Sequence, residues 1–232
     1  MGQKNRFVAM DAASPHVNFE VNSLKWTEKQ KMFIEEALDK ETKIVICEAP
    51  PGVGKTILSL YCSLTLLSER KVDQVMYIRN PVESSEDKLG YLKGGFEEKM
   101  APFDAPMVDN LSKLLAVEDN RKLARESQID SMPLGYLKGR TFDNIALIID
   151  EAEDLSHQQT LLALTRLGKG GKIFLIGDSK QSNVKRSGFA RAKEMFDDDI
   201  AEEKGIVTLE FGPEDIMRHD LTQFIYNRYT KD

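Results

Sequence analysis

The fold of this chain is decided by the stretch Ala49-Pro50-Pro51-Gly52-Val53-Gly54-Lys55-Thr56. A short apolar run over residues 43–47, rich in β-branched side chains, precedes it and predicts a buried strand. The apolar spacing over 56–70 predicts a helix after it. A glycine-rich loop between a strand and a helix is the setting of a phosphate-binding P-loop, because its backbone N–H groups and the helix N-terminus both favour negative charge.

Two side chains at the end of this loop have expected roles. Lys55 would reach the β and γ phosphates of a nucleotide, and the hydroxyl of Thr56 would ligate Mg²⁺. Ala49 stands where the full consensus has glycine, but Gly52 and Gly54 keep the tight part of the turn. The alternative is an ordinary strand-to-helix loop. The residues expected to bind the nucleotide here are Pro51, Gly52, Val53, Gly54, Lys55, Thr56 and Ile57.

Strands and helices alternate along the rest of the chain. Further strand-like runs occupy residues 75–78, 145–149, 173–176 and 206–209. Helical patterns occupy residues 27–38, 156–167, 187–196 and 214–229. This alternation predicts an α/β fold with a mostly parallel sheet and helices on both faces. Residues 80–140 show no clear strand and are expected to form an insertion of loop and short helices above the sheet. We expect one domain over 25–232, preceded by an irregular arm over 1–24.

The composition is that of a soluble globular protein. The chain has 232 residues, of which 41% are hydrophobic and 30% charged, and its net charge of −6 argues against a broadly basic nucleic-acid-binding surface. No apolar run approaches the roughly 18 residues that cross a bilayer, and Arg6 stands where a myristoylation site needs Ser or Thr. We therefore expect a cytoplasmic protein without a membrane partner, in which Cys47 and Cys62 are buried reduced thiols.

Two polar motifs follow other strands, at the ends where parallel sheets bind ligands. Asp150 and Glu151 come directly after an apolar run, and we expect them at the tip of a strand neighbouring the P-loop strand. Asp150 would hold Mg²⁺, and Glu151 would polarise the attacking water. The turn Gly177-Asp178-Ser179-Lys180-Gln181 follows a further strand, and its glutamine would sense the γ phosphate. Taken alone, each motif is also compatible with a strand that ends in a polar turn.

Several motifs occur along the chain in an order that is specific. They are the P-loop, Arg79-Asn80-Pro81-Val82, Leu89-Gly90-x-Leu92-x-Gly94, Gly139-Arg140-Thr141, Asp150-Glu151 and Gly177-Asp178-x-x-Gln181. In this the chain resembles the PhoH-like ATPases, which are related to the first RecA-like half of superfamily 1 helicases. The resemblance runs from about Trp26 to Tyr229. It implies a RecA-like P-loop NTPase fold, ATP binding and hydrolysis, and a link to RNA.

The resemblance also assigns one residue ahead of the P-loop strand. It implies that Gln30 corresponds to the adenine-contacting glutamine of the family. From the residues alone, Gln30 is a helix-surface amide or, together with Thr27, part of a capping box. The chain departs from the family at Glu153, where Gln or Asn is usual, and this substitution leaves the nucleotide chemistry intact.

Too few residues follow Gln181 to form the second RecA-like domain with which a superfamily 1 helicase completes its ATP site. We therefore expect a homo-oligomer, a head-to-tail ring of which a hexamer is one form, in which each subunit supplies an arginine to its neighbour. Arg218 is the first candidate and Arg166 the second, although each could be an exposed arginine paired with a carboxylate. Arg79 and Arg140 are candidates for contacts with single-stranded RNA, although basic residues on an acidic protein are usually solvated surface.

The function expected from these residues is ATP hydrolysis with Mg²⁺, coupled to RNA binding or to helicase-like remodelling. Lys55, Glu151, Gln181 and Arg218 are the expected catalytic residues. Two alternatives stay open. A P-loop kinase would need an arginine-bearing lid and an acceptor pocket, and a non-hydrolysing, nucleotide-bound scaffold would tolerate the loss of Glu151.

Overall fold

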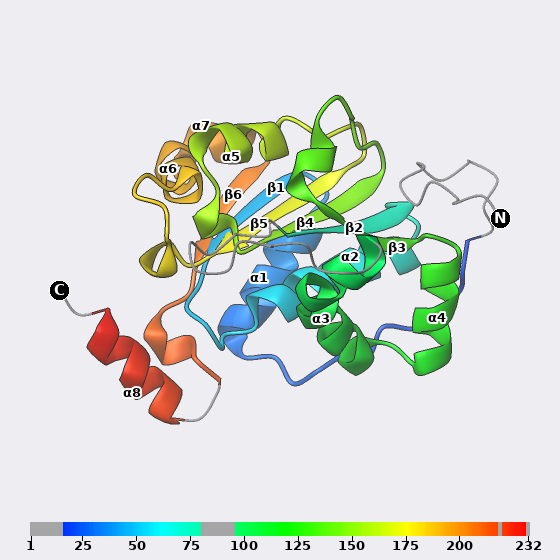
Figure 1. Cartoon of the computed structure of the whole chain (residues 1–232), viewed down its shortest axis with the longest axis horizontal. Helices are drawn as coiled ribbons and strands as arrows, with labels where there is room; N and C mark the ends of the chain where they lie inside the picture. The colour runs from blue at the N-terminus through cyan, green and yellow to red at the C-terminus, as the bar shows by residue number, and fades with distance from the viewer. Residues whose placement is uncertain (1–15, 80–95, 218–219, 231–232) are drawn as a thin grey trace.

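A computed structural model describes residues 16–79, 96–217 and 220–230 of the chain (Figure 1). Its centre is a six-stranded sheet in the order β3-β2-β4-β5-β1-β6, in which every neighbouring pair is parallel. The strands are β1 (Ile44–Glu48), β2 (Gln74–Arg79), β3 (Ile129–Pro133), β4 (Ile145–Asp150), β5 (Lys172–Gly177) and β6 (Ile206–Glu210). The predicted α/β fold with a parallel sheet is confirmed.

Helices cover both faces of the sheet (Figure 1). One face carries α1 (Glu28–Leu38), α2 (Lys55–Ser68), α3 (Phe96–Leu114) and α4 (Val117–Arg125), and the other carries α5 (His157–Leu164), α6 (Gly188–Met195) and α7 (Asp199–Glu203). The side chains of β1 alternate between the two cores: Val45 and Cys47 lie in the first, and Ile44 and Ile46 lie in the second. Such alternation is the consequence of burying a strand on both faces. Cys47 and Cys62 are buried free thiols, as predicted.

Where the structure describes residues 80–140, the prediction was right about helices and wrong about the absence of a strand. Residues 80–95 lie outside the described residues, but α3 and α4 pack in the first core and β3 joins the sheet beside β2. The sequence of β3, Ile-Asp-Ser-Met-Pro, is short and polar and ends in proline. The sheet tolerates such a strand at its edge because an edge strand pairs on one side only. These residues therefore complete the domain rather than interrupt it.

The segment before α1 has no regular structure in its described part, yet it is not detached from the domain. Val17, Phe19, Val21 and Leu24 pack against the first core, and the ring of Trp26 lies 5.1 Å from that of Tyr61. These apolar contacts across α2 and α3 fix the path of the chain into α1. The division into an arm over 1–24 and a domain over 25–232 stays a prediction.

The C-terminal segment differs from the continuous helix predicted over 214–229. A single 3₁₀ turn (Pro213–Asp215) comes first, and α8 (Asp220–Tyr229) then stands away from the sheet (Figure 1). Proline at the start of this turn fixes its backbone and is compatible with the first position of a helix. Among the helices that the structure describes, none is long and apolar enough to cross a membrane.

Candidate nucleotide site at the carboxyl edge of the sheet

The predicted motifs meet at the carboxyl ends of three adjacent strands, β1, β5 and β4. Glu48 ends β1 opposite Gly177 of β5, and Ile149 of β4 lies opposite Leu175 of β5. The acidic strand β4 is therefore not the direct neighbour of the P-loop strand, as the sequence led us to expect, because β5 lies between them. Parallel strands direct their carboxyl ends to one edge, so the three motifs still share one site.

The P-loop has the backbone that phosphate binding requires. Gly52 and Gly54 have φ angles of 94° and 88°, a left-handed conformation that glycine adopts without steric cost. Gly54 precedes the first residue of α2, and no side chain caps the helix, which leaves its first backbone N–H groups to a ligand. The side chains of Val53 and Ile57 pack against the core, so these two residues would offer only backbone groups to a nucleotide.

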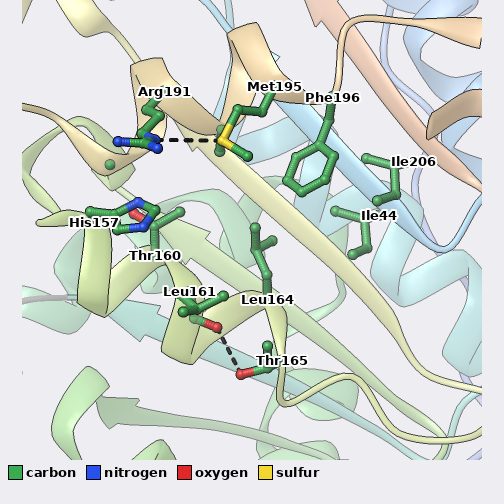
Figure 2. A pocket seen from close by; sticks show the side chains of 12 residues that line it. Ile44, His157, Thr160, Leu161, Leu164, Thr165, Arg191, Met195, Phe196 and Ile206 are labelled. Atoms are coloured by element: carbon green, nitrogen blue, oxygen red, sulfur yellow. Dashed lines mark hydrogen bonds between the residues drawn. The ribbon is translucent and has the colours of Figure 1, made fainter. Parts of the chain in front are cut away.

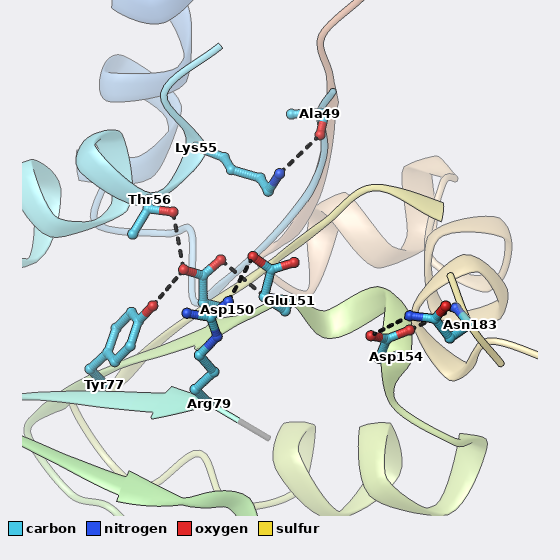
Figure 3. A network of polar contacts seen from close by, with 9 residues as sticks. All are labelled: Ala49, Lys55, Thr56, Tyr77, Arg79, Asp150, Glu151, Asp154 and Asn183. Atoms are coloured by element: carbon cyan, nitrogen blue, oxygen red, sulfur yellow. Dashed lines mark hydrogen bonds and ion pairs between the residues drawn. The ribbon is translucent and has the colours of Figure 1, made fainter. Parts of the chain in front are cut away.

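The cationic group of the loop lies among carboxylates (Figure 3). The Nζ atom of Lys55 donates a long hydrogen bond of 3.4 Å to the carbonyl of Ala49. Its charge lowers the pKa values of Asp150, Glu153 and Asp178, which burial raises. A lysine held this loosely beside an anion-binding loop is available to a phosphate group.

Asp150 is the most firmly held carboxylate of the site. Its Oδ2 atom accepts hydrogen bonds from the hydroxyls of Thr56 (3.0 Å) and Tyr77 (2.6 Å), and its Oδ1 atom accepts one from the backbone N–H of Glu151 (3.0 Å; Figure 3). Burial raises the pKa of Asp150, and the hydrogen bond from Tyr77 opposes this effect. Sequence reasoning missed Tyr77; the signal was one polar hydroxyl in an otherwise aliphatic part of β2.

The donor set formed by Thr56 and Asp150 fits Mg²⁺. A hydroxyl and a carboxylate oxygen 3.0 Å apart are hard oxygen ligands, and Mg²⁺ commonly takes one or two protein ligands and completes its shell with phosphates and water. In the part of the chain that the structure describes, no three His, Cys, Asp or Glu side chains cluster to hold a metal by themselves. The ion would therefore bind here together with a nucleotide.

Glu151 lies in a strained position beside a cation. Its φ angle of 54° is in the left-handed region, which costs energy for a residue other than glycine and is enriched at functional sites. Its Oε1 atom lies 3.2 Å from Nη2 of Arg79, the last residue of β2. In this structure the guanidinium of Arg79 pairs with the carboxylate expected to polarise water, and an RNA contact by Arg79 stays a prediction.

Glu153 is buried next to this pair, in a place that the sequence did not single out for chemistry. Its Oε2 atom has no hydrogen-bond partner among the described residues and lies 2.6 Å from the position that a Cβ atom on Gly177 would take. Burial, followed by a hydrogen bond with Glu151, raises the pKa of Glu153 to about 8. A protonated carboxyl group donates and accepts hydrogen bonds, as does the amide of Gln or Asn.

Two further carboxylates complete the edge. Oε1 of Glu48 accepts hydrogen bonds from the N–H (2.8 Å) and the hydroxyl (2.9 Å) of Ser179, and Oδ1 of Asp178 accepts one from the hydroxyl of Tyr226 (3.2 Å). Burial raises the pKa of both acids, and one oxygen of each is buried without a partner in the described residues. Glu48 was missed, although a charge at the end of a β-branched run is a visible signal. Gln181 lies exposed in the following 3₁₀ turn.

Gln30 is buried, so its description as a helix-surface amide was wrong. Its Oε1 atom accepts a hydrogen bond from the N–H of Thr27, which confirms the capping box, and its Nε2 atom donates one of 2.9 Å to the carbonyl of Val53. The amide therefore joins the start of α1 to the P-loop. An adenine contact by Gln30 stays a prediction.

Two other arginines that were expected to act on partners make contacts within their own chain. Arg140 lies in the segment that leads into the amino end of β4, with its guanidinium 5.1 Å from the ring of Phe142. Arg166 donates hydrogen bonds to the carbonyl of Arg140 and the hydroxyl of Thr165, so its guanidinium is engaged within its own chain. Arg218 lies outside the described residues.

The buried Glu153 gives the free energy of unfolding a pH dependence that can be measured without nucleotide. An unfolded glutamate loses its proton near pH 4.5, whereas the folded one keeps it to about pH 8, so rising pH between these values favours unfolding. In urea titrations, the free energy of unfolding of Glu153→Gln, taken relative to that of the native protein, should rise by about 1–2 kcal/mol from pH 6 to pH 8. Exposed Glu203→Gln is the control, and parallel pH profiles for the native protein and Glu153→Gln would refute the assignment.

Comparison with known proteins agrees with this site. A family model described as PhoH-like protein matches residues 24–230. A PhoH-like protein of Synechocystis sp. is 32% identical over 208 residues, which are 88% of this chain and 61% of that protein. A PhoH-like protein of Bacillus subtilis is 33% identical over 195 residues, 83% of this chain and 60% of that protein. The chain thus spans about three fifths of the length of these two relatives.

A solved structure supports the fold. The large terminase from a thermophilic bacteriophage superposes with a TM-score of 0.54 and 12% identity, over 88% of this chain and 50% of the terminase chain. At this identity the likeness concerns the fold alone, and it agrees with the predicted RecA-like P-loop architecture. With the match of the family model over nearly the whole sequence, these results show that the chain belongs to the PhoH-like protein family.

Proposed function

We propose that this chain binds ATP with Mg²⁺ and hydrolyses it. The observation that carries the proposal is the juxtaposition of the P-loop with Asp150, whose carboxylate lies within hydrogen-bond distance of the Thr56 hydroxyl. The glycine backbone and Lys55 would bind the phosphates, and Thr56 and Asp150 would hold the ion. Mg²⁺, when bound, would neutralise charge on the phosphate oxygens.

Glu151 is the residue that favours hydrolysis over transfer to another acceptor. Its partly exposed carboxylate projects from the strand tip next to Asp150, where it could orient a water molecule and accept its proton. Arg79 holds this carboxylate at 3.2 Å, and the buried Glu153 lies beside it. These two neighbours would set the orientation of Glu151. Gln181, exposed on the adjacent tip, would contact the γ phosphate.

The coupling of this reaction to RNA and to a ring of identical subunits is a separate part of the proposal. It is supported by the family resemblance. Arg218 would enter the site of the next subunit, and Arg79 and Arg140 would contact single-stranded RNA. Remodelling of RNA in the manner of a helicase is the consequence we propose.

Phosphate release from ATP tests the assigned residues. Lys55→Ala and Glu151→Gln should each lower the rate at least about 100-fold, since one loses a phosphate ligand and the other the group that activates water. Two matched controls should keep the native rate. Lys40→Ala removes an exposed lysine, and Asp154→Asn changes a carboxylate that lies three residues from Glu151 and binds Asn183.

Other outcomes of the same assay are informative. Hydrolysis that neither variant changes would contradict the site, and phosphate that appears on another molecule would favour the kinase alternative. Binding of ATP without hydrolysis would favour the scaffold. Single-stranded RNA should raise the native rate; an unchanged rate would remove the proposed coupling to RNA and leave the ATPase.

Mixing two inactive variants tests the arginine supplied by a neighbour. Arg218→Ala keeps an intact nucleotide site, and Glu151→Gln keeps an intact Arg218. Each variant alone should hydrolyse ATP slowly, and the loss of an arginine finger should lower the rate by about 10³-fold. Mixed assemblies should recover at least about tenfold over either variant, because some sites then have both groups. A mixture no faster than the mean of its components, or an Arg218→Ala protein with the native rate, would rule out this role. Arg166→Ala tests the second candidate in the same way.

A further inference from the structure

Exposed apolar side chains are concentrated on two surfaces of the molecule. Six of the twelve large apolar side chains that are exposed in the described residues lie on one or the other. The first surface, which we call the α8 stripe, consists of Leu221, Phe224, Ile225 and Tyr229. Phe224, Ile225 and Tyr229 are 55%, 47% and 89% exposed. The spacing of the four residues places them on one side of α8, the arrangement of a helix that packs against a partner.

Helix α8 is anchored to the nucleotide site rather than free. Its one buried side chain among the described residues, Tyr226, donates a hydrogen bond to Asp178 (3.2 Å). Just before the helix, the N–H of Met217 donates one of 3.1 Å to the carbonyl of Gly52 in the P-loop, and Asp215 forms an ion pair of 2.9 Å with Lys29. The helix is thus held at the carboxyl edge of the sheet while the α8 stripe faces outward.

The second surface is an apolar groove between α5 and α6 (Figure 2). Its volume is about 260 Å³, and its walls include Leu161 and Met195, which are 54% and 53% exposed. The volume lies below the roughly 300–1,000 Å³ of typical small-molecule sites, so protruding side chains suit it better than a cofactor does. Arg191 is the cation at its rim, and its Nε atom contacts the sulfur of Met195 at 3.5 Å.

The two surfaces do not meet within the chain, since no described residue of α8 lines the groove. The groove runs along both helices, from His157 and Gly188, the first residues of α5 and α6, to Ile44 and Ile206, the first residues of β1 and β6. Tyr226 holds α8 beside Asp178 at the carboxyl edge of the sheet. Two complementary surfaces at different places on one subunit form a heterologous contact between copies.

We propose that the α8 stripe of one copy docks into the α5–α6 groove of the next. Phe224 and Ile225 would enter the groove, and Asp220, which neighbours Phe224 on the helix surface, would face Arg191. This contact repeats from copy to copy and closes into a ring or continues as a filament. The inference rests on the head-to-tail association in the proposed function and names the surfaces that make it.

Docking would also act on the nucleotide site. The same helix contacts Asp178 through Tyr226, and the segment before it contacts Gly52. A partner that holds α8 in place therefore stabilises two of the groups around the P-loop. The ATPase rate per subunit should rise with protein concentration in the range where copies associate.

Sedimentation equilibrium of the full chain with Mg²⁺ and ATP tests the contact. The native protein should associate reversibly, and Phe224→Ser on the helix or Leu161→Asp on the groove should each weaken association at least about tenfold. Both side chains are about half exposed, so the fold should survive, and Met32→Ser, exposed on α1, is the matched control. Asp220→Arg and Arg191→Asp should each weaken association, and the double variant should restore it.

A native protein that stays monomeric to about 100 μM, a concentration at which contacts of micromolar affinity are populated, would overturn the proposal. Variants that associate like the control, or a charge exchange without restoration, would overturn it as well. ATP hydrolysis by a monomer would refute the contact and the proposed ring, and would leave the proposed ATPase. Association without hydrolysis would refute the ATPase and leave the contact.

Discussion

The arrangement of the site depends on one buried carboxylate, that of Asp150. Removing a charge from water is costly unless hydrogen bonds replace the lost hydration. Two hydroxyls and one backbone N–H do so here, from Thr56 at the start of α2, Tyr77 in β2 and Glu151. These bonds tie the P-loop helix to strands β2 and β4, on the far side of β5. The carboxyl edge of the sheet therefore has a fixed geometry before any ligand binds.

Around Asp150 the edge carries an excess of acid over base. Glu48, Glu153 and Asp178 are all buried with raised pKa values, and each has one oxygen without a partner among the described residues. Lys55 is the cation that lowers three of the acidic pKa values here. A bound cation would offset this excess of acidic groups, which is consistent with a nucleotide that binds together with Mg²⁺. Tyr226 extends the same network to α8, where an apolar surface is available to a second copy.

Local patterns predicted the parallel sheet, its helices and the residues of the P-loop, because strand periodicity and loop chemistry are written in short stretches. Four features depend on tertiary contacts and were missed. Strand β3 is polar because it lies at an edge, and the long α3 belongs to the core rather than to an insertion. Gln30 is buried because the P-loop folds back over it. The pairing of Arg79 with Glu151 follows from the strand order, which places β2 beside β4.

The central claim is that Thr56 and Asp150 form a Mg²⁺ site that works with the P-loop. Calorimetric titration with ADP, with and without Mg²⁺, tests it most directly in the native protein and in Asp150→Asn, after circular dichroism has shown that the variant is folded. The account predicts that Mg²⁺ raises the ADP affinity of the native protein and leaves that of the variant nearly unchanged. An equal effect of Mg²⁺ on both proteins would contradict it.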